Sequence, residues 1–124
     1  MPISHEWNPP LLVTRYTGKV TGEELIQEAI SVSGDPRFDS LRYIIGDWTG
    51  ATESETTPED VEKLAVYIEQ ISRSNPNVKN ATITYNRESS KALAALYLML
   101  TETTSWKTEM FNTMEGALNW CTGE

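Results

Sequence analysis

Residues 41–47 read LRYIIGD, and residues 57–60 read TPED. The first stretch predicts a buried strand that ends in a carboxylate, because a short apolar run bounded by polar residues is typical of a strand inside a sheet. The second predicts a helix start: Thr57 supplies a capping hydroxyl, Pro58 fits the first turn, and the two acids that follow favour the positive end of the helix dipole. Residues 48–57 (WTGATESETT) are predicted to be a polar loop between the two.

Three further helices are predicted. Thr21 and Glu24 form a capping box, in which side chains and backbone satisfy each other's exposed donors, after a turn at residues 18–20. Asn112 and Glu115 predict a similar start for the last helix. The four helices are expected from 21 to before 34, from 57 to before 75, from about 89 to 103, and from 112 to near 123.

Between the helices lie five stretches with the alternation or the β-branched composition of strands. Their expected limits are residues 3–7 (an edge strand, followed by a proline turn), 11–17, 41–47, 78–85 and 107–111. Strands that alternate with helices of ten to fifteen residues imply parallel neighbours and helical crossovers. The sequence therefore predicts an α/β fold: a mixed, mainly parallel sheet of about five strands with four helices, as a single domain over residues 1–124.

The charge balance and the single cysteine limit the classes of partner and compartment. Eighteen Asp and Glu against ten Lys and Arg give a net charge of −8. This acidity argues against nucleic acid or an anionic membrane surface as the main partner. Cys121 has no disulfide partner, the N-terminus has no signal-peptide pattern, and the apolar run 92–100 is far shorter than the ~20 residues of a membrane span. We expect a cytoplasmic protein without a transmembrane segment.

The residues that carry chemistry predict neither an enzyme nor a metal site. Imidazole chemistry would depend on His5 alone, and Cys121 falls on the apolar stripe of the last helix, where a buried thiol is typical. The acids between 53 and 62 lack the order and the glycine of a calcium loop, so they indicate a solvated loop and helix start. A hydrolase or transferase that uses carboxylates is disfavoured, since two acids with shifted pKa would have to share a cleft. We expect no catalytic residue, no metal and no cofactor.

Two features suggest where a ligand or a partner would bind. Trp48 stands just after a strand's carboxyl end, where open α/β sheets bind ligands, although a tryptophan there is also typical of the lid of a core. Residues 92–100 (ALAALYLML) contain no charge, so every face of this helix is apolar. Such a helix is either buried by its own chain or presents a second face to another protomer or to an apolar ligand.

Four segments of the chain form a recognisable pattern: residues 18–25 (GKVTGEEL), 35–39 (DPRFD), 43–47 (YIIGD) and 111–120 (FNTMEGALNW). With these segments the sequence resembles the STAS domain and, more narrowly, the SpoIIAA-like family of small standalone bacterial proteins. The resemblance covers nearly the whole chain and rests mostly on turns, caps and core positions.

The resemblance implies a regulatory role but not its usual switch. In STAS antagonists a Ser at the start of the second helix is phosphorylated by a partner kinase that doubles as the anti-sigma factor. Asp47 matches the acid at the strand end, but residues 55–58 (ETTP) replace the Asp-Ser-Ser-Gly segment. A phosphate on Thr57 would lie among four carboxylates, which repel it, so kinase-dependent switching there is not expected. Thr56 remains an alternative acceptor, and some members of the wider group are linked to lipid-binding folds.

We therefore expect a non-enzymatic regulatory or binding module, with a protein partner or a small apolar ligand. The alternative is a carrier of a small apolar ligand or lipid, in which the third helix and Trp48 line a cavity. A homodimer through the outer face of the third helix is also predicted, because a sheet covers only one stripe of that helix. The expected binding residues are Asp47, Trp48, Thr49, Thr56 and Thr57, and the expected dimer or apolar-ligand face comprises Tyr97, Leu98 and Met99.

Overall fold

The computed structural model describes residues 3–84 and 88–123. Within these residues the chain forms five strands, four α-helices and one 3-10 helix, η1 (Pro36–Ser40). The strands are β1 (Ile3–Asn8), β2 (Leu11–Thr21), β3 (Tyr43–Glu55), β4 (Lys79–Ile83) and β5 (Lys107–Phe111). The α-helices are α1 (Gly22–Ser33), α2 (Pro58–Ser74), α3 (Glu88–Thr101) and α4 (Met114–Thr122). None of the helices in these two ranges combines the length and the apolarity that crossing a bilayer requires.

The strands lie in the sheet in chain order, β1 to β5. The β1–β2 pair is antiparallel, and the other three neighbouring pairs are parallel. The prediction of a mixed, mainly parallel sheet with four helices is confirmed.

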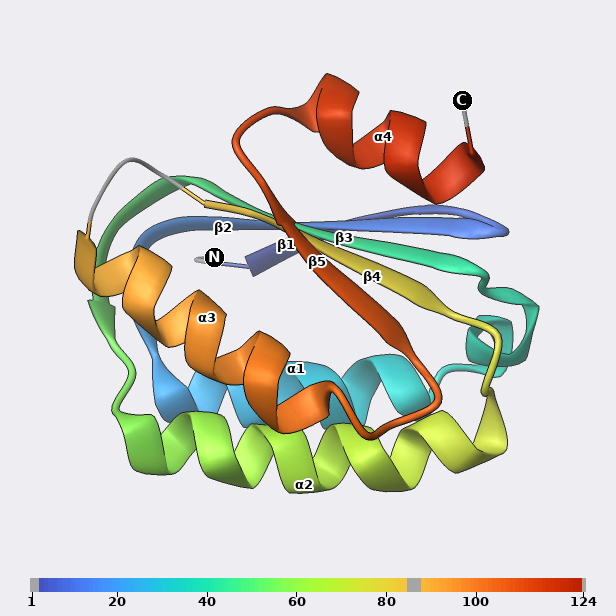
Figure 1. Cartoon of the computed structure of the whole chain (residues 1–124), viewed down its shortest axis with the longest axis horizontal. Helices are drawn as coiled ribbons and strands as arrows, with labels where there is room; N and C mark the ends of the chain where they lie inside the picture. Colours follow the sequence, from blue (N-terminus) through green and yellow to red (C-terminus); the bar gives the residue numbers. More distant parts are fainter. Residues whose placement is uncertain (1–2, 85–87, 124) are drawn as a thin grey trace.

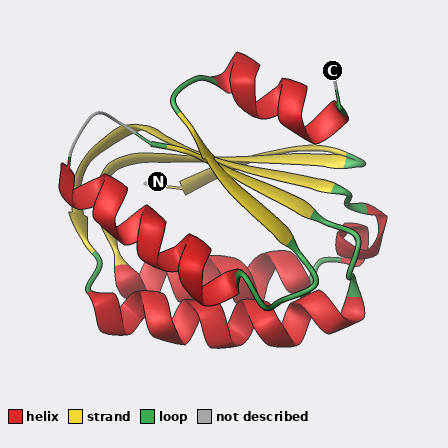
Figure 2. Ribbon diagram, in the orientation of Figure 1, coloured by secondary structure: helices red, strands yellow, loops and turns green. Residues whose placement is uncertain are grey.

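The helices are distributed unequally over the two faces of this sheet. Helices α1, α2 and α3 each connect one parallel strand to the next in the same direction across the sheet. Because such crossovers are almost always right-handed, helices that advance in one direction are placed on one face. Figure 1 shows all three beneath the sheet and α4 alone on the other face, and Figure 2 shows the same division of helices around the strands.

The predicted polar loop at residues 48–57 is wrong, because β3 continues to Glu55. The predicted turn at residues 18–20 is also part of a strand, since β2 runs to Thr21. The two extensions pair with each other, from Thr17 opposite Gly50 to Thr21 opposite Glu55. A neighbouring backbone satisfies the hydrogen bonds of this segment, so its polar composition does not prevent a strand.

The helix starts agree with the sequence except for the last one. Thr21 and Thr57 cap α1 and α2 through complete capping boxes. The cap of α4 is Thr113, whose hydroxyl accepts from the amide of Gly116, and not Asn112 as predicted. Helix α3 ends at Thr101, two residues before the expected limit. The fourth strand was predicted over residues 78–85, but β4 ends at Ile83, one residue before Thr84. The predicted last residue, Tyr85, lies outside the described residues.

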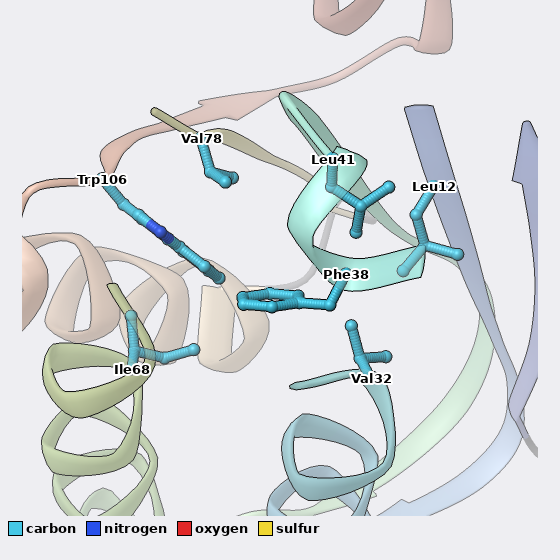
Figure 3. Close-up of a cluster of buried hydrophobic side chains, with 7 residues drawn as sticks. All are labelled: Leu12, Val32, Phe38, Leu41, Ile68, Val78 and Trp106. Atoms are coloured by element: carbon cyan, nitrogen blue, oxygen red, sulfur yellow. The ribbon is translucent and has the colours of Figure 1, made fainter. Parts of the chain in front are cut away.

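The core is divided by the sheet into two parts. On the face of the three helices, seven buried side chains form the cluster in Figure 3: Leu12, Val32, Phe38, Leu41, Ile68, Val78 and Trp106. On the face of α4, a second cluster contains Val13, Ile45, Ala81, Ile83, Ala117 and Cys121. Adjacent residues such as Leu12 and Val13 belong to different clusters, as the two-residue period of a strand requires.

Candidate functional site

A cavity of about 170 Å³ lies between the sheet and helices α1, α2 and α3, and we call it the helical-face cavity. Apolar residues of the helices form most of one wall, and every second residue of β2, β3 and β4 forms the other. The helical wall includes Leu25, Ala29, Val32, Val61, Leu64, Ile68, Ile71, Leu93 and Ala94. The strand wall contains Thr14, Tyr16, Ile44, Gly46, Trp48, Asn80, Thr82 and Thr84.

The strand wall is polar where a central parallel strand is normally apolar on both faces. Thr14, Gly46 and Thr82 lie opposite one another across β2, β3 and β4. Gly46, in the middle of this row, has no side chain to fill the space between the two threonines. Polar groups on a wall that faces apolar helices are the composition expected of a small-molecule site.

A carboxylate from α1, that of Glu28, is held at the cavity by two neighbouring strands. His5 on β1 places Nε2 within 2.7 Å of Glu28 Oε1 and 2.6 Å of Oε2. Thr14 Oγ1 donates to Glu28 Oε2 at 3.2 Å. An ionised carboxylate only accepts hydrogen bonds, so Nε2 is the donor of the histidine ring here. The Glu28 carboxylate therefore has protein partners on both oxygens.

Two tyrosine hydroxyls also belong to the cavity wall. Tyr97 Oη donates to Asn80 Oδ1 at 2.6 Å, and Asn80 Nδ2 donates to the carbonyl of Ile44 at 3.1 Å. Burial raises the pKa of Tyr97 far above the usual range of a phenol. Burial also raises the pKa of Tyr16, and the nearby Glu28 carboxylate raises it further. Both phenols therefore stay neutral at physiological pH.

Thr84, directly after β4, is 5% exposed and carries a buried hydroxyl. Among the described residues, its Oγ1 has no hydrogen-bond partner. Leaving a buried hydroxyl unpaired costs about 1–3 kcal/mol. Such a group in a cavity wall is a donor or acceptor available to a bound molecule.

Comparison with known proteins supports the fold and not a family. No protein-family model matches the chain, and a search of curated proteins finds no match. A solved structure titled as the anti-sigma factor antagonist SpoIIAA in its unphosphorylated form matches with a TM-score of 0.62 and 13% identity, over 98% of this chain and 99% of that chain. This chain has the SpoIIAA-like, STAS-type fold.

A second solved structure with a SpoIIAA-like fold matches over 96% of this chain and 91% of its own length. It is an uncharacterized protein of the DUF3478 family from Shewanella loihica PV-4, with a TM-score of 0.55 and 17% identity. At these identities both structures support the shared fold alone, and the site must be judged from the residues of this chain.

The five residues predicted to bind a ligand or partner near the end of the third strand do not converge on one site. Trp48 and Thr56 line the helical-face cavity, and Trp48 stacks on Tyr16 with ring centroids 4.1 Å apart. Asp47 and Thr49 bond to each other instead, with Thr49 Oγ1 2.7 Å from Asp47 Oδ1. Thr57 uses its hydroxyl to cap α2. Binding by these five residues stays a prediction.

The predicted apolar face of α3 is also divided. Tyr97 lines the cavity and packs against the buried cluster drawn in Figure 3. Leu98 is half-buried, whereas Met99 is 62% exposed and points away from the core. The predicted homodimer through Leu98 and Met99 stays a prediction.

Sequence reasoning missed Glu28 and the polar rows of the strands, although both left a signal. Glu28 lies on the apolar stripe of α1 with Leu25, Ala29 and Val32, where a charge is unexpected. Thr82 on the central strand β4 and Thr84 directly after it alternate with the buried Ala81 and Ile83, where a solvated face is not available. Charged or polar residues at buried periodic positions are therefore the signal that a sequence search should use.

The residues that the sequence excluded from catalysis lie apart from one another. His5 binds Glu28 at the edge strand, while Cys121 is buried in the cluster beneath α4. Burial raises the pKa of the Cys121 thiol to about 11. Within residues 3–84 and 88–123, no group of three His, Cys, Asp or Glu side chains converges as metal ligands would.

Proposed function

We propose that this protein is a non-enzymatic binding module that takes up a small, mostly apolar molecule in the helical-face cavity. The observation that carries the proposal is a cavity of about 170 Å³ between apolar helices and a strand wall that carries several neutral polar groups. An engineered apolar cavity of about 150 Å³ in another protein is large enough to bind benzene. The volume here suits a single small ring or a short chain.

The binding is proposed to serve regulation, since the fold is that of a structure titled as an anti-sigma factor antagonist. A ligand bound between the sheet and three helices would stiffen the packing of those helices, and a protein partner that contacts them would respond to it. Cargo transport by a carrier would use the same cavity without such a partner.

We further propose that Thr57 is not a phosphorylation switch. Its hydroxyl accepts from the Asp60 amide at 3.2 Å, and Asp60 Oδ2 accepts from the Thr57 amide at 3.0 Å. A phosphate there would disrupt this capping box and would lie beside the Asp60 carboxylate. Recovery of a Thr57 phosphopeptide at high occupancy from the native host would contradict this.

Cavity binding is tested by filling the cavity from α3. Ala94 lines the cavity, whereas the next residue, Ala95, is exposed on the same helix, so Ala95→Phe is a matched control for Ala94→Phe. We expect toluene, followed by NMR titration, to bind the wild type and Ala95→Phe but not Ala94→Phe. Denaturant midpoints establish that both variants fold.

Either of two results would overturn the proposed function. Toluene that shifts no resonance of the wild-type cavity wall would show that the hollow does not accept small apolar molecules. Equal binding by Ala94→Phe and Ala95→Phe would place the bound toluene elsewhere on the protein.

A further inference from the structure

The charges of the cavity wall restrict which molecules can occupy it. Among the described residues that line the cavity, Glu28 carries the only full charge, and the set contains no lysine, arginine or histidine. A ligand carboxylate would leave water for a site that offers it no cation and places a second carboxylate nearby. Burial of an uncompensated charge is strongly unfavourable.

A cationic ligand is also disfavoured, because the Glu28 carboxylate already has its partners. Both of its oxygens lie within 2.7 Å of His5 Nε2, and Oε2 also accepts from Thr14. An ammonium group would have to displace one of these donors to gain an ion pair. It would also lose its hydration shell in a cavity whose other walls are mostly apolar.

The remaining polar groups of the wall are neutral. The pKa values of Tyr16 and Tyr97 are raised by burial, so both phenols keep their protons. The Tyr97 hydroxyl already donates its hydrogen bond to Asn80, whereas the Thr84 hydroxyl has no partner among the described residues. A neutral oxygen on the ligand would satisfy that hydroxyl at no cost in buried charge.

We infer that the cavity selects an electrically neutral molecule about the size of a single ring, with one oxygen that pairs with the Thr84 hydroxyl. The inference rests on the proposed function and narrows it to alcohols, phenols and ketones as the ligand class. It excludes fatty acids and amines of the same size.

The test uses four probes with one ring in common: toluene, benzyl alcohol, benzoate and benzylammonium, titrated at pH 7 and followed by NMR. We expect benzyl alcohol to bind at least ten-fold more tightly than either charged probe. Thr84→Val keeps the shape and removes the hydroxyl. It should lower the affinity for benzyl alcohol relative to toluene by about three- to ten-fold, the effect of one hydrogen bond.

Glu28→Gln supplies a second, independent measurement. The amide removes the negative charge at nearly constant size, so the affinity for benzoate relative to toluene should rise. A ratio that does not rise would show that Glu28 does not exclude anions.

The outcomes separate this inference from the proposed function. If toluene does not bind, the cavity is not a ligand site and both fail. If toluene binds but benzoate binds as tightly as benzyl alcohol, only the selection for neutral molecules is wrong. Benzylammonium as the tightest probe would make Glu28 a cation site and would overturn the inference in the same way.

Discussion

The two faces of the sheet are built from alternate residues of the same strands, yet one is closely packed and the other has a cavity beside its buried cluster. Beneath α4, Val13, Ile45 and Ala81 pack with Ala117 and Cys121, and each of these five side chains is at most 3% exposed. On the opposite face the next residues along each strand, including Thr14, Gly46 and Thr82, border the helical-face cavity.

The difference follows from what covers each face. One short helix can approach a sheet until its small residues contact the strands, and Ala117 and Cys121 allow that approach. Three helices that also pack against one another cannot each approach the sheet as closely. The space left between them and the strand residues Thr14, Gly46 and Thr82 is the helical-face cavity. The cavity therefore results from the placement of three crossover helices on one face. The polar side chains in its wall supply hydrogen-bonding groups.

Substitution of two adjacent isoleucines tests the difference in packing between the two faces, and it has the largest expected effect on stability. Ile45 is fully buried beneath α4, whereas Ile44 faces the cavity. We expect Ile45→Ala to lower the free energy of unfolding by about 3–4 kcal/mol and Ile44→Ala by about 1–2 kcal/mol, because a side chain beside a void loses fewer contacts. Urea denaturation followed by tryptophan fluorescence measures both. Equal losses would show that the two faces are packed alike.

The closed face should also protect its thiol from ionisation. Burial raises the pKa of Cys121 from 9.0 to about 11, so the neutral thiol is favoured in the folded protein. The sign implies that stability falls as the pH rises from about 9 to 11, because the unfolded chain ionises first. We expect the ¹³Cβ shift of this single cysteine to stay constant up to pH 10 in the folded protein. A titration midpoint near pH 9 would show that burial beneath α4 does not raise the pKa of the Cys121 thiol.

The smallest expected change in stability comes from a comparison of two buried threonines, which differ in whether the hydroxyl is hydrogen-bonded. Thr84→Val should raise the free energy of unfolding by about 1 kcal/mol, since it removes a hydroxyl that has no partner among the described residues. Thr101 is fully buried, and its hydroxyl donates to the carbonyl of Tyr97 at 2.7 Å. Thr101→Val should therefore lower the free energy of unfolding by about 1–2 kcal/mol. Changes of the same sign in urea denaturation would show that the two hydroxyls do not differ in partners.

The helices and strands could be predicted from the sequence, but some of their first and last residues could not, for physical reasons. The caps at Thr21 and Thr57 are local, because each capping box closes within three residues. The second half of β3 could not be found in this way, since residues 50–55 are held by the backbone of β2 and not by an apolar face of their own. The same limitation applies to the site. Trp48 was expected because it follows the predicted strand end at Asp47, although β3 continues past it to Glu55. Its cavity neighbours Glu28 and Thr84 were not expected.

The sequence by itself determined the alternation of strands and helices, the starts of α1 and α2 at their capping residues, and the absence of a second cysteine for a disulfide. These features depend on contacts within a few residues or on composition. Only the tertiary structure decided that three crossovers cover one face of the sheet. It also brought Glu28, Thr14 and His5 together from three different elements. Beside the helical-face cavity it placed the Thr84 hydroxyl, which has no partner within the described part of the chain. Strand order and helix packing depend on contacts between residues far apart in the chain, and no local pattern encodes the space that remains between them.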